Sequence, residues 1–354
     1  MLCLGIESTA HTFASSVIEC SSIVNPVDGN RLTNQENLHA RILSDSRSVF
    51  LPSKGSGIHP RLASRHHAEV SADILRESLN ESGHCIRDID IIAYSAGPGL
   101  GPCLRVGAVV SRTLASFYNK PLVPVNHALG HVELGIMLTH ASNPLVLLLS
   151  GGHTMILAFS ENRWRVFGET LDLTIGQLLD QFGRANGLSS PCGDRIEQFA
   201  RKSTGSYIRL PYVVKGNDVS YSGVLSAAKR LLDTRRGNSE FFADLCYSLQ
   251  ETAFAMISET IERAISFFGK KEVLVVGGVA ANNRLKDMLH QACLRHSSEL
   301  FVLPCKFAGD NGCQIAWTGI VDYLSGHNKV EVEKSFVHQS WRIDTVDVQW
   351  RRLT

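Results

Sequence analysis

The chain has 354 residues, 44% of them hydrophobic and 19% charged, and its 35 basic and 34 acidic side chains leave a net charge of +1. This composition predicts a folded protein of about two domains and excludes a disordered chain, a strongly basic nucleic-acid coat and an acidic tail. Nine cysteines without a C-x-x-C pair argue against a disulfide framework and a zinc–thiolate site. No apolar run reaches the ~18 residues of a membrane span, and residues 1–6 lack the basic start of a signal peptide. We therefore expect a soluble protein of a reducing compartment.

Two distant segments repeat one pattern, and each predicts a β-hairpin. Residues 2–19 join two apolar runs through Ser8-Thr9-Ala10-His11-Thr12, and residues 145–161 join two more through Ser150-Gly151-Gly152-His153-Thr154. Small residues in both turns suit a tight connection. This repeat indicates an internal duplication.

A second pattern, a buried strand followed by a glycine loop and a helix, also occurs twice. Residues 91–95 lead through loop 96–101 into a helix predicted over 105–118. Late in the chain, residues 273–276 lead through loop 277–283 into a helix ending near residue 295.

The order of these elements, with further helices over 68–82 and 241–268, predicts two α/β lobes with a cleft between them. We place the boundary at Asn143-Pro144, so that the first lobe spans residues 1–144 and the second spans residues 145–354. The polar stretch 21–37 is predicted to be an exposed excursion from the first hairpin.

Two glycine loops of the second lobe are candidates for a nucleotide site, although a single loop of this kind is usually only a turn. Ser150-Gly151-Gly152 and Gly277-Gly278 each follow a predicted buried strand, and glycine allows backbone N–H groups to approach a phosphate closely. The second loop also precedes a helix, whose N-terminus favours anions. Neither is a Walker A loop or G-x-G-x-x-G, which excludes P-loop NTPases and Rossmann dehydrogenases.

His127 and His131 are four residues apart in a predicted helix, so both imidazoles can reach one metal ion. Position 128 is alanine, so the segment is not H-E-x-x-H. A pair of surface or packed histidines is the alternative interpretation. Asp310, in a loop before an apolar helix, is a possible third ligand, and two histidines with one carboxylate suit iron or another divalent metal.

Ordered motifs extend over nearly the whole chain: Gly5-Ile6-Glu7-Ser8-Thr9-Ala10-His11-Thr12, Gly57-Ile58-His59-Pro60 with His66-His67, Asn126-His127 with His131, Ser150-Gly151-Gly152, Gly168-Glu169-Thr170-Leu171-Asp172, residues 277–283 and Asp310-Asn311-Gly312. Together they resemble the universal tRNA threonylcarbamoyladenosine transferases. Residues 210–216, 220–223 and 339–351 resemble the cytosolic archaeal and eukaryotic branch of that family.

The resemblance implies the duplicated fold of actin, the chaperone ATPases and the sugar kinases, with a central nucleotide cleft. It implies transfer of the threonylcarbamoyl group from threonylcarbamoyladenylate to N6 of adenosine 37 in tRNAs that read ANN codons, with release of AMP. This branch of the family works in the KEOPS complex with a kinase-like ATPase, a dimerising subunit and accessory subunits. We therefore expect tRNA and these subunits as partners, no membrane, and a location in the cytoplasm and also the nucleus.

The resemblance also implies particular site residues. The ligands of one divalent ion, iron or zinc, would be His127, His131 and Asp310. The nucleotide would be held by Leu148, Leu149, Ser150, Gly151, Gly152, Asp180, Gly193, Glu197 and Asn282. The cytosolic branch carries a tyrosine ligand at the place of Leu148, so substrate or water would complete the coordination here. No general base is assigned, with His59 and His67 as candidates.

Two other classes of function stay open. One is a metallopeptidase, against which the missing glutamate at position 128 counts. The other is a non-catalytic scaffold gated by a nucleotide. For Asp180 and Glu197, a solvated helix face is the alternative to a nucleotide contact.

Overall fold

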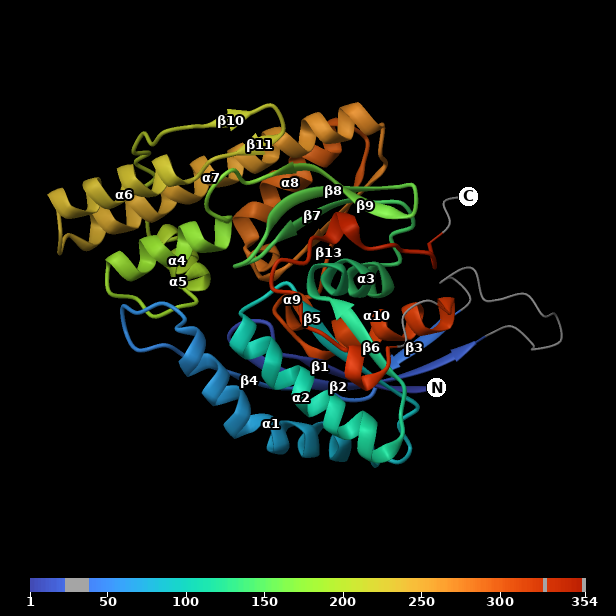
Figure 1. Ribbon diagram of the computed structural model, residues 1–354. Coiled ribbons are helices and arrows are strands. Elements are labelled where there is room, and N and C mark those ends of the chain that lie inside the picture. Colours follow the sequence, from blue (N-terminus) through green and yellow to red (C-terminus); the bar gives the residue numbers. More distant parts are fainter. Residues whose placement is uncertain (23–37, 327–329, 352–354) are drawn as a thin grey trace.

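The computed structural model describes residues 1–22, 38–326 and 330–351, whose helices and strands form two α/β lobes (Figure 1). The excursion predicted over 21–37 lies outside the described residues, except that residues 21 and 22 end strand β2. No helix in the described part of the chain is long and apolar enough to cross a membrane.

The sheet of the first lobe has the strand order β3-β2-β1-β5-β6. β1 (Leu2–Glu7) and β2 (Thr12–Ser22) form the predicted antiparallel hairpin. β5 (Ile91–Gly97) pairs with β1 in parallel, and β6 (Leu122–Asn126) pairs with β5 in the same way. β3 (Leu38–Ile42) and β4 (Ser46–Val49) both pair with β2.

The sheet of the second lobe repeats this topology in the order β9-β8-β7-β12-β13. Its hairpin is β7 (Leu145–Leu149) with β8 (Thr154–Ser160), and β9 (Arg163–Glu169) continues it antiparallel. β12 (Glu272–Val276) and β13 (Glu299–Val302) add parallel strands. A separate small hairpin joins β10 (Val214–Lys215) to β11 (Asp218–Val219). The matching orders confirm the predicted duplication.

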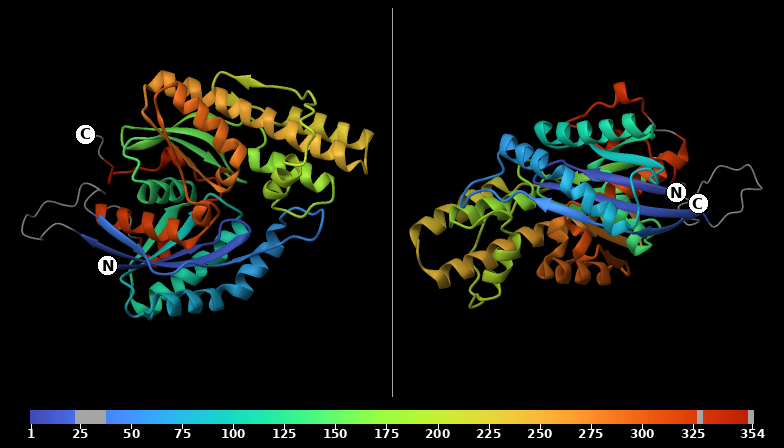
Figure 2. Two further views of the ribbon diagram at one scale, coloured as in Figure 1. Left: turned by 180° about the vertical axis from the view of Figure 1, so that it is seen from behind. Right: turned by 90° about the horizontal axis from the view of Figure 1, so that it is seen from below.

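Helices cover the outer faces of both sheets, and two helices lie between the sheets (Figure 1). α1 (Pro60–Ser82) and α2 (Gly101–Tyr118) cover the first sheet. α3 (His127–Thr139) and α10 (Gly312–Ser325) lie between the sheets. The second lobe carries α4 (Ile175–Ala185), α5 (Gly193–Ala200), α6 (Ser222–Thr234), α7 (Ser239–Phe268) and α8 (Asn283–Arg295), of which α4, α5 and α6 gather at one end (Figure 2). Short helices are η2 (Gly278–Ala281), α9 (Cys305–Ala308), η3 (Val332–Lys334) and η4 (Ile343–Thr345).

The predicted helices are confirmed, with changes at their starts. The helix predicted over 68–82 begins earlier, at Pro60, because proline suits the first helical position. The helix predicted over 105–118 begins at Gly101. Strand β7 is buried on both faces, since Leu147 and Leu149 pack in the second lobe while Val146 and Leu148 pack in the core shared with α3 and α10. Burial of both faces explains its continuous apolar sequence.

The predicted lobe boundary near residue 144 separates the two sheets, but residues 145–354 do not all lie in the second lobe. Helix α10 packs against β1, β2 and β5 of the first sheet. A Cβ placed on Gly5 of β1 would lie 2.4 Å from the backbone nitrogen of Ala316, so glycine permits this close packing. Because the chain order alone does not say which sheet an apolar helix covers, this part of the prediction was wrong.

Candidate metal and nucleotide site

Helix α3 presents its two histidines at its first turn, between the two sheets. His127 directly follows β6, and the side chain of Asn126 caps the helix by accepting the N–H of Leu129 at 3.1 Å. The spacing of four residues puts His131 on the same face, and the two ring centroids lie 4.8 Å apart. Both side chains are buried.

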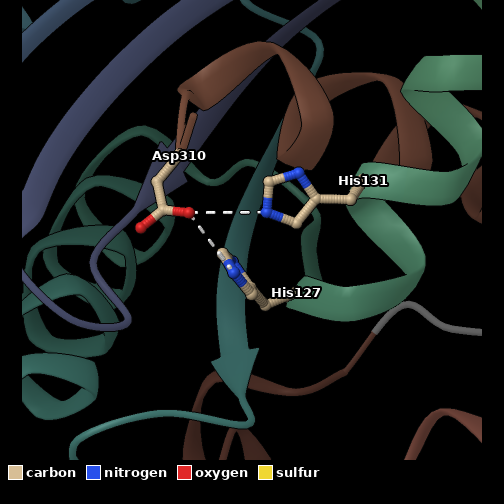
Figure 3. A group of neighbouring side chains, drawn as sticks. All are labelled: His127, His131 and Asp310. Atoms are coloured by element: carbon tan, nitrogen blue, oxygen red, sulfur yellow. Dashed lines mark ion pairs between the residues drawn. The ribbon is translucent and has the colours of Figure 1, made fainter. Parts of the chain in front are cut away.

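Asp310 reaches the histidines from the loop between α9 and α10. Its Oδ1 lies 3.4 Å from Nε2 of His131 and 3.6 Å from Nε2 of His127 (Figure 3). The next residue, Asn311, caps α10 by accepting the N–H of Gln314, which fixes where the loop ends. The structure therefore brings the three predicted ligands together from opposite ends of the sequence.

The chemistry of these donors fits a divalent metal. The three ligand atoms lie within 4.8 Å of one another, and theirs is the one such cluster found in the described residues. Nε2 of buried His131 has no hydrogen-bond partner within the described chain, although it faces a carboxylate oxygen. A four-coordinate ion with bonds of about 2.0–2.1 Å separates its ligands by about 3.4 Å, close to the 3.4 and 3.6 Å from Oδ1 of Asp310 to the two imidazole nitrogens.

A buried carboxylate that the sequence analysis did not assign to the site orients His127. Oε2 of Glu7, at the end of β1, lies 2.9 Å from Nδ1 of His127, and Oε1 accepts the N–H of Thr9 at 2.6 Å. Nε2 of Gln314 is 3.1 Å from the same Nδ1. A carboxylate on the outer nitrogen fixes the tautomer that leaves Nε2 available to a metal. The sequence feature that could have identified Glu7 is a charged residue at the end of an apolar strand.

The same contacts shift the protonation of the cluster. Burial disfavours the charged form of His127, but the Glu7 carboxylate outweighs burial and raises the pKa of His127 to about 9. Burial lowers the pKa of His131. Burial by itself would raise the pKa of Asp310, yet the facing imidazoles of His131 and His127 hold it well below its usual range. Asp310 is therefore already the carboxylate that a metal ligand must be. His127 without a metal is protonated near neutral pH, so a bound ion would have to displace the proton from its Nε2.

The glycine loop between β7 and β8 is exposed at Gly151 and Gly152. Oγ of Ser150 accepts the N–H groups of Gly152 and His153 at 3.2 and 3.0 Å, which closes the turn. The hydroxyl of Thr174, the N-cap of α4, donates to the carbonyl of Gly151 at 2.9 Å. The N-terminus of α4 therefore lies beside the loop, and helix N-termini favour phosphate.

This loop borders the candidate metal ligands. The ring of His153, directly after Gly152, lies 6.4 Å from the ring of His127. Burial lowers the pKa of His153 to about 3, so this imidazole is neutral. Helix α9, which leads to Asp310, contacts η2 of the second glycine loop. The two predicted sites are thus neighbours.

The other residues predicted for the nucleotide already have partners within the second lobe. Oδ1 of Asp180 accepts the N–H of Cys192 at 2.6 Å. Oε1 of Glu197 accepts from the side chain of Asn283 at 3.0 Å and is ion-paired to Arg201. Asn282 caps α8 by accepting the N–H of Leu285 at 3.2 Å and donates to Gln250 at 2.7 Å. These bonds connect α4, α5 and α8 around the glycine loops.

The remaining predicted residues lie in three different settings. Gly193 begins α5, and Leu149 is fully buried at the end of β7. Leu148 is fully buried in the core shared with α3 and offers no ligand atom. His59 is exposed at the N-cap of α1, whereas His67 is fully buried, with its ring 5.7 Å from that of Phe13. Neither histidine belongs to the candidate metal cluster of His127, His131 and Asp310.

The repeated sheets define a class of duplicated two-lobed α/β proteins. HypF from T. kodakarensis matches 92% of this chain, and the chain matches 48% of HypF, with a TM-score of 0.59 and 13% identity. Full-length HypF in a phosphate- and nucleotide-bound form matches 91% of this chain and is matched over 46% of its own length, with a TM-score of 0.56 and 10% identity. At these identities the likeness establishes the fold alone, and it confirms the predicted fold class.

Within this class, sequence comparison identifies the family. The model of the TsaD family, described as tRNA N6-adenosine threonylcarbamoyltransferase, matches residues 41–317. Proteins of that name from Staphylothermus marinus and Sulfurisphaera tokodaii are each 43% identical, over 98% of this chain and over 99% and 98% of their own lengths. The chain belongs to the tRNA N6-adenosine threonylcarbamoyltransferase family and is an enzyme of that activity.

One relative is longer than this chain. A "probable bifunctional tRNA threonylcarbamoyladenosine biosynthesis protein" from Methanothermobacter thermautotrophicus is 44% identical over 99% of this chain, which covers 61% of that protein. Its name, like those of the shorter relatives, makes tRNA the substrate of the family.

Proposed function

We propose that this enzyme transfers the threonylcarbamoyl group from threonylcarbamoyladenylate to N6 of adenosine 37 in tRNAs that read ANN codons, and that AMP is released. The observation that carries the proposal is the meeting of two features in a chain of this family. The cluster of His127, His131 and Asp310 lies beside the exposed turn Gly151-Gly152, with His153 at 6.4 Å from His127. Metal ligands next to a phosphate-binding turn suit an adenylate whose phosphate is the leaving group.

His127, His131 and Asp310 would hold one divalent ion, either iron or zinc, through two imidazoles and one carboxylate. When bound, the ion supplies a positive charge that neutralises the phosphate leaving group. Glu7 orients His127 for this role through its Nδ1. Leu148 cannot contribute a ligand, so substrate or water completes the coordination.

The nucleotide half of the adenylate would lie along the second lobe. Leu148, Leu149, Ser150, Gly151 and Gly152 form the strand end and the exposed turn beside which the phosphate would lie. The N–H groups of Ser150 and Gly152 donate within the turn, so Gly151 is the glycine whose N–H would face the phosphate. Asp180, Gly193, Glu197 and Asn282 would line the ribose and base side. Hydrogen bonds from Cys192 to Asp180 and from Asn283 to Glu197 connect α4, α5 and α8 there.

The transfer itself is a substitution at the carbamoyl carbon. N6 of adenosine forms a new bond to this carbon, the bond from carbon to the phosphate oxygen breaks, and AMP leaves with that electron pair while one N6 proton is released. The adenylate is a mixed anhydride and is already activated, so the protein's main task is to align a weakly nucleophilic amine. The target base must leave the anticodon-loop stack to reach the site. We leave the general base unassigned between His59 and His67, neither of which lies in the cluster.

We further infer that the chain is the catalytic subunit of a KEOPS-type complex with a kinase-like ATPase, a dimerising subunit and accessory subunits, in the cytoplasm and also the nucleus. A net charge of +1 gives little overall attraction to tRNA, so other subunits must supply part of the binding surface. The longer relative, named as bifunctional, favours a second protein acting together with this one.

One experiment tests both parts of the proposal. The purified chain is given tRNA, threonylcarbamoyladenylate and Zn²⁺ or Fe²⁺, with and without the partner subunits, and modified adenosine is measured by mass spectrometry in a single turnover. We expect weak tRNA binding and slow transfer by the chain alone, and restoration of both by the partners. Equal rates in the two conditions would contradict the complex, and absence of modified adenosine in both would contradict the reaction.

A further inference from the structure

The last described segment of the chain crosses from the first lobe to the second and touches both ends of the histidine segment of α3. We name residues 336–351 the C-terminal strap. The strap begins on the first lobe, where the N–H of His338 donates to the carbonyl of Ala96 at 2.7 Å. It ends on the second lobe, where the N–H of Val348 donates to the carbonyl of Asn162, also at 2.7 Å.

At the start of α3, the strap contacts the residue that precedes His127. The side-chain amide of Asn126 donates to the carbonyl of Trp341 at 3.0 Å, while its oxygen caps the helix. One side chain therefore links the helix start to the strap. The backbone position of His127 depends on this link.

Two residues after His131, the strap contacts α3 again through a fully buried carboxylate. Oε2 of Glu133 accepts the indole N–H of Trp350 at 3.2 Å, and Oε1 accepts the indole N–H of Trp164 in β9 at 3.3 Å. A buried carboxylate is costly unless hydrogen bonds satisfy it, so these two donors contribute to fixing the position of Glu133. Glu133 thereby joins α3 to the second sheet and to the strap.

The end of the strap is itself held tightly. Arg351 donates to the carbonyl of Ser142 at 2.7 Å, and its guanidinium lies 5.2 Å from the ring of Trp164. Val348 and Trp350 are buried in the core shared by α3 and α10. These contacts leave Trp350 little freedom to follow a movement of α3.

We propose that the C-terminal strap positions helix α3, and with it the two histidines, relative to both lobes, and that Trp350 is a positioning residue for the metal site. The role of the histidines as ligands rests on the proposed function. Functional side chains must be held within about 0.5 Å and 10–20° of their working geometry. The strap meets this requirement by fixing α3 on both sides of His127 and His131.

The test uses the full-length chain with Trp350→Phe, which keeps an aromatic ring in the core and removes the N–H donor to Glu133. The matched control is Tyr207→Phe, which removes the hydrogen bond from this hydroxyl to Thr252 in the second lobe, 2.9 Å long and away from α3. Two quantities are measured: hydrogen exchange of the α3 amides in metal-free protein, and the rate at which bound Zn²⁺ is lost to a chelator.

We expect Trp350→Phe to speed exchange in α3 about fivefold and Zn²⁺ loss roughly tenfold, because one hydrogen bond to a charged group and the orientation of the ligands are lost. Tyr207→Phe leaves both rates unchanged. Unchanged rates in Trp350→Phe would overturn the inference, as would equal acceleration of exchange in α3 and in remote helices such as α7, since that indicates only a loss of global stability.

A second variant keeps the test decisive if Trp350→Phe does not fold. Asn126→Ser retains a capping oxygen but cannot reach the carbonyl of Trp341, so it is expected to change both rates in the same direction. If wild-type protein binds neither Zn²⁺ nor Fe²⁺, the proposed metal site fails, and the exchange rates of α3 decide the positional role of the strap independently.

Discussion

The two lobes share one topology, but their glycine loops differ in how closely the rest of the chain packs against them. In the first lobe, other segments of the chain pack directly against the loop at the end of β5. The N–H of Leu100 donates to the carbonyl of Thr9 at 2.7 Å, so this loop closes onto the turn of its own hairpin. A Cβ on Gly97, at φ +150°, would lie 1.9 Å from the carbonyl oxygen of His338 in the strap.

In the second lobe, the hairpin turn at Gly151 and the loop after β12 at Gly278 are open. A Cβ on Gly151 or Gly278 would meet no atom within 4 Å. Gly277 is the exception, since its Cβ would lie 2.3 Å from the carbonyl oxygen of Leu149, which brings the two loops of this lobe together. Open backbone beside a helix N-terminus is what a phosphate requires.

This difference indicates that the two duplicated lobes contribute different chemical groups to the candidate site. The first lobe contributes side chains, with Glu7, His127 and His131 all on its elements. The second lobe contributes accessible backbone at Gly151 and Gly278. The strap that fills the first glycine loop also holds α3, so the closed loop and the histidines belong to one rigid assembly. Variants in each lobe can test whether the first lobe contributes side chains and the second lobe contributes open backbone.

The largest expected effect concerns the side chains of the first lobe. The double variant His127→Ala with His131→Ala is expected to lose all bound metal and keep its circular dichroism spectrum, because Asp310 alone is a weak ligand set. Metal content by elemental analysis measures this. The exposed His59→Ala serves as control and keeps its metal. Stoichiometric metal in the double variant would refute the assigned ligands.

The next effect concerns the closed loop of the first lobe. Gly97→Ala is expected to lower the free energy of unfolding by about 2–4 kcal/mol, because a side chain there adds backbone strain and collides with the strap. Gly278→Ala, in open space in the second lobe, should change it by less than about 1 kcal/mol. Urea unfolding gives both values. Similar losses in the two variants would show that the loops do not differ as described.

A histidine buried in the first lobe predicts an acid sensitivity. Burial, with the charge of His66 as a smaller cause, lowers the pKa of His67 to about 4, from an ordinary value of about 6.5. Between these two pH values the unfolded chain binds a proton at this residue and the folded chain does not, so stability falls as the pH falls through this window. Above pH 6.5 both states are neutral and the residue adds no pH dependence.

His67→Phe should therefore reduce the loss of stability between about pH 6.5 and 4 by about 1–3 kcal/mol. The measurement is urea unfolding at several pH values. Phe13→Leu is the control, because it changes the packing beside the ring of His67 without removing a titratable group, and it should keep the wild-type pH dependence. If the free energy of unfolding of His67→Phe falls with pH as steeply as that of the wild type, His67 does not cause the loss of stability in acid.

The smallest expected effect concerns the open loop of the second lobe. Gly151→Val should weaken AMP binding roughly tenfold, because its branched side chain occupies the space from which a phosphate approaches the backbone. The free energy of unfolding should change by less than about 0.5 kcal/mol, since the site is exposed. Calorimetric titration measures the affinity, and Gly223→Val on exposed α6 is the control. Unchanged AMP affinity in Gly151→Val would make the loop only a turn.

Several features of this protein could be predicted from the sequence because they depend on neighbouring residues. The apolar runs and the turns of small residues in 2–19 and 145–161 predicted both hairpins, which the strand pairing confirms. The spacing of His127 and His131 placed both imidazoles on one helix face, as their ring separation shows. The motifs carried the family assignment, which the comparisons confirm.

Other features were decided only by the tertiary structure, because they join residues far apart in the chain. Local patterns could not place α10 on the first sheet, since an apolar helix has suitable surfaces on either lobe. They could not show that Glu7 contacts His127, 120 residues away, or that Trp350 contacts Glu133 across 217 residues. The spacing of residues along the sequence predicts contacts within one helix or strand. The contacts that hold α3 in position form only when separate elements pack against each other.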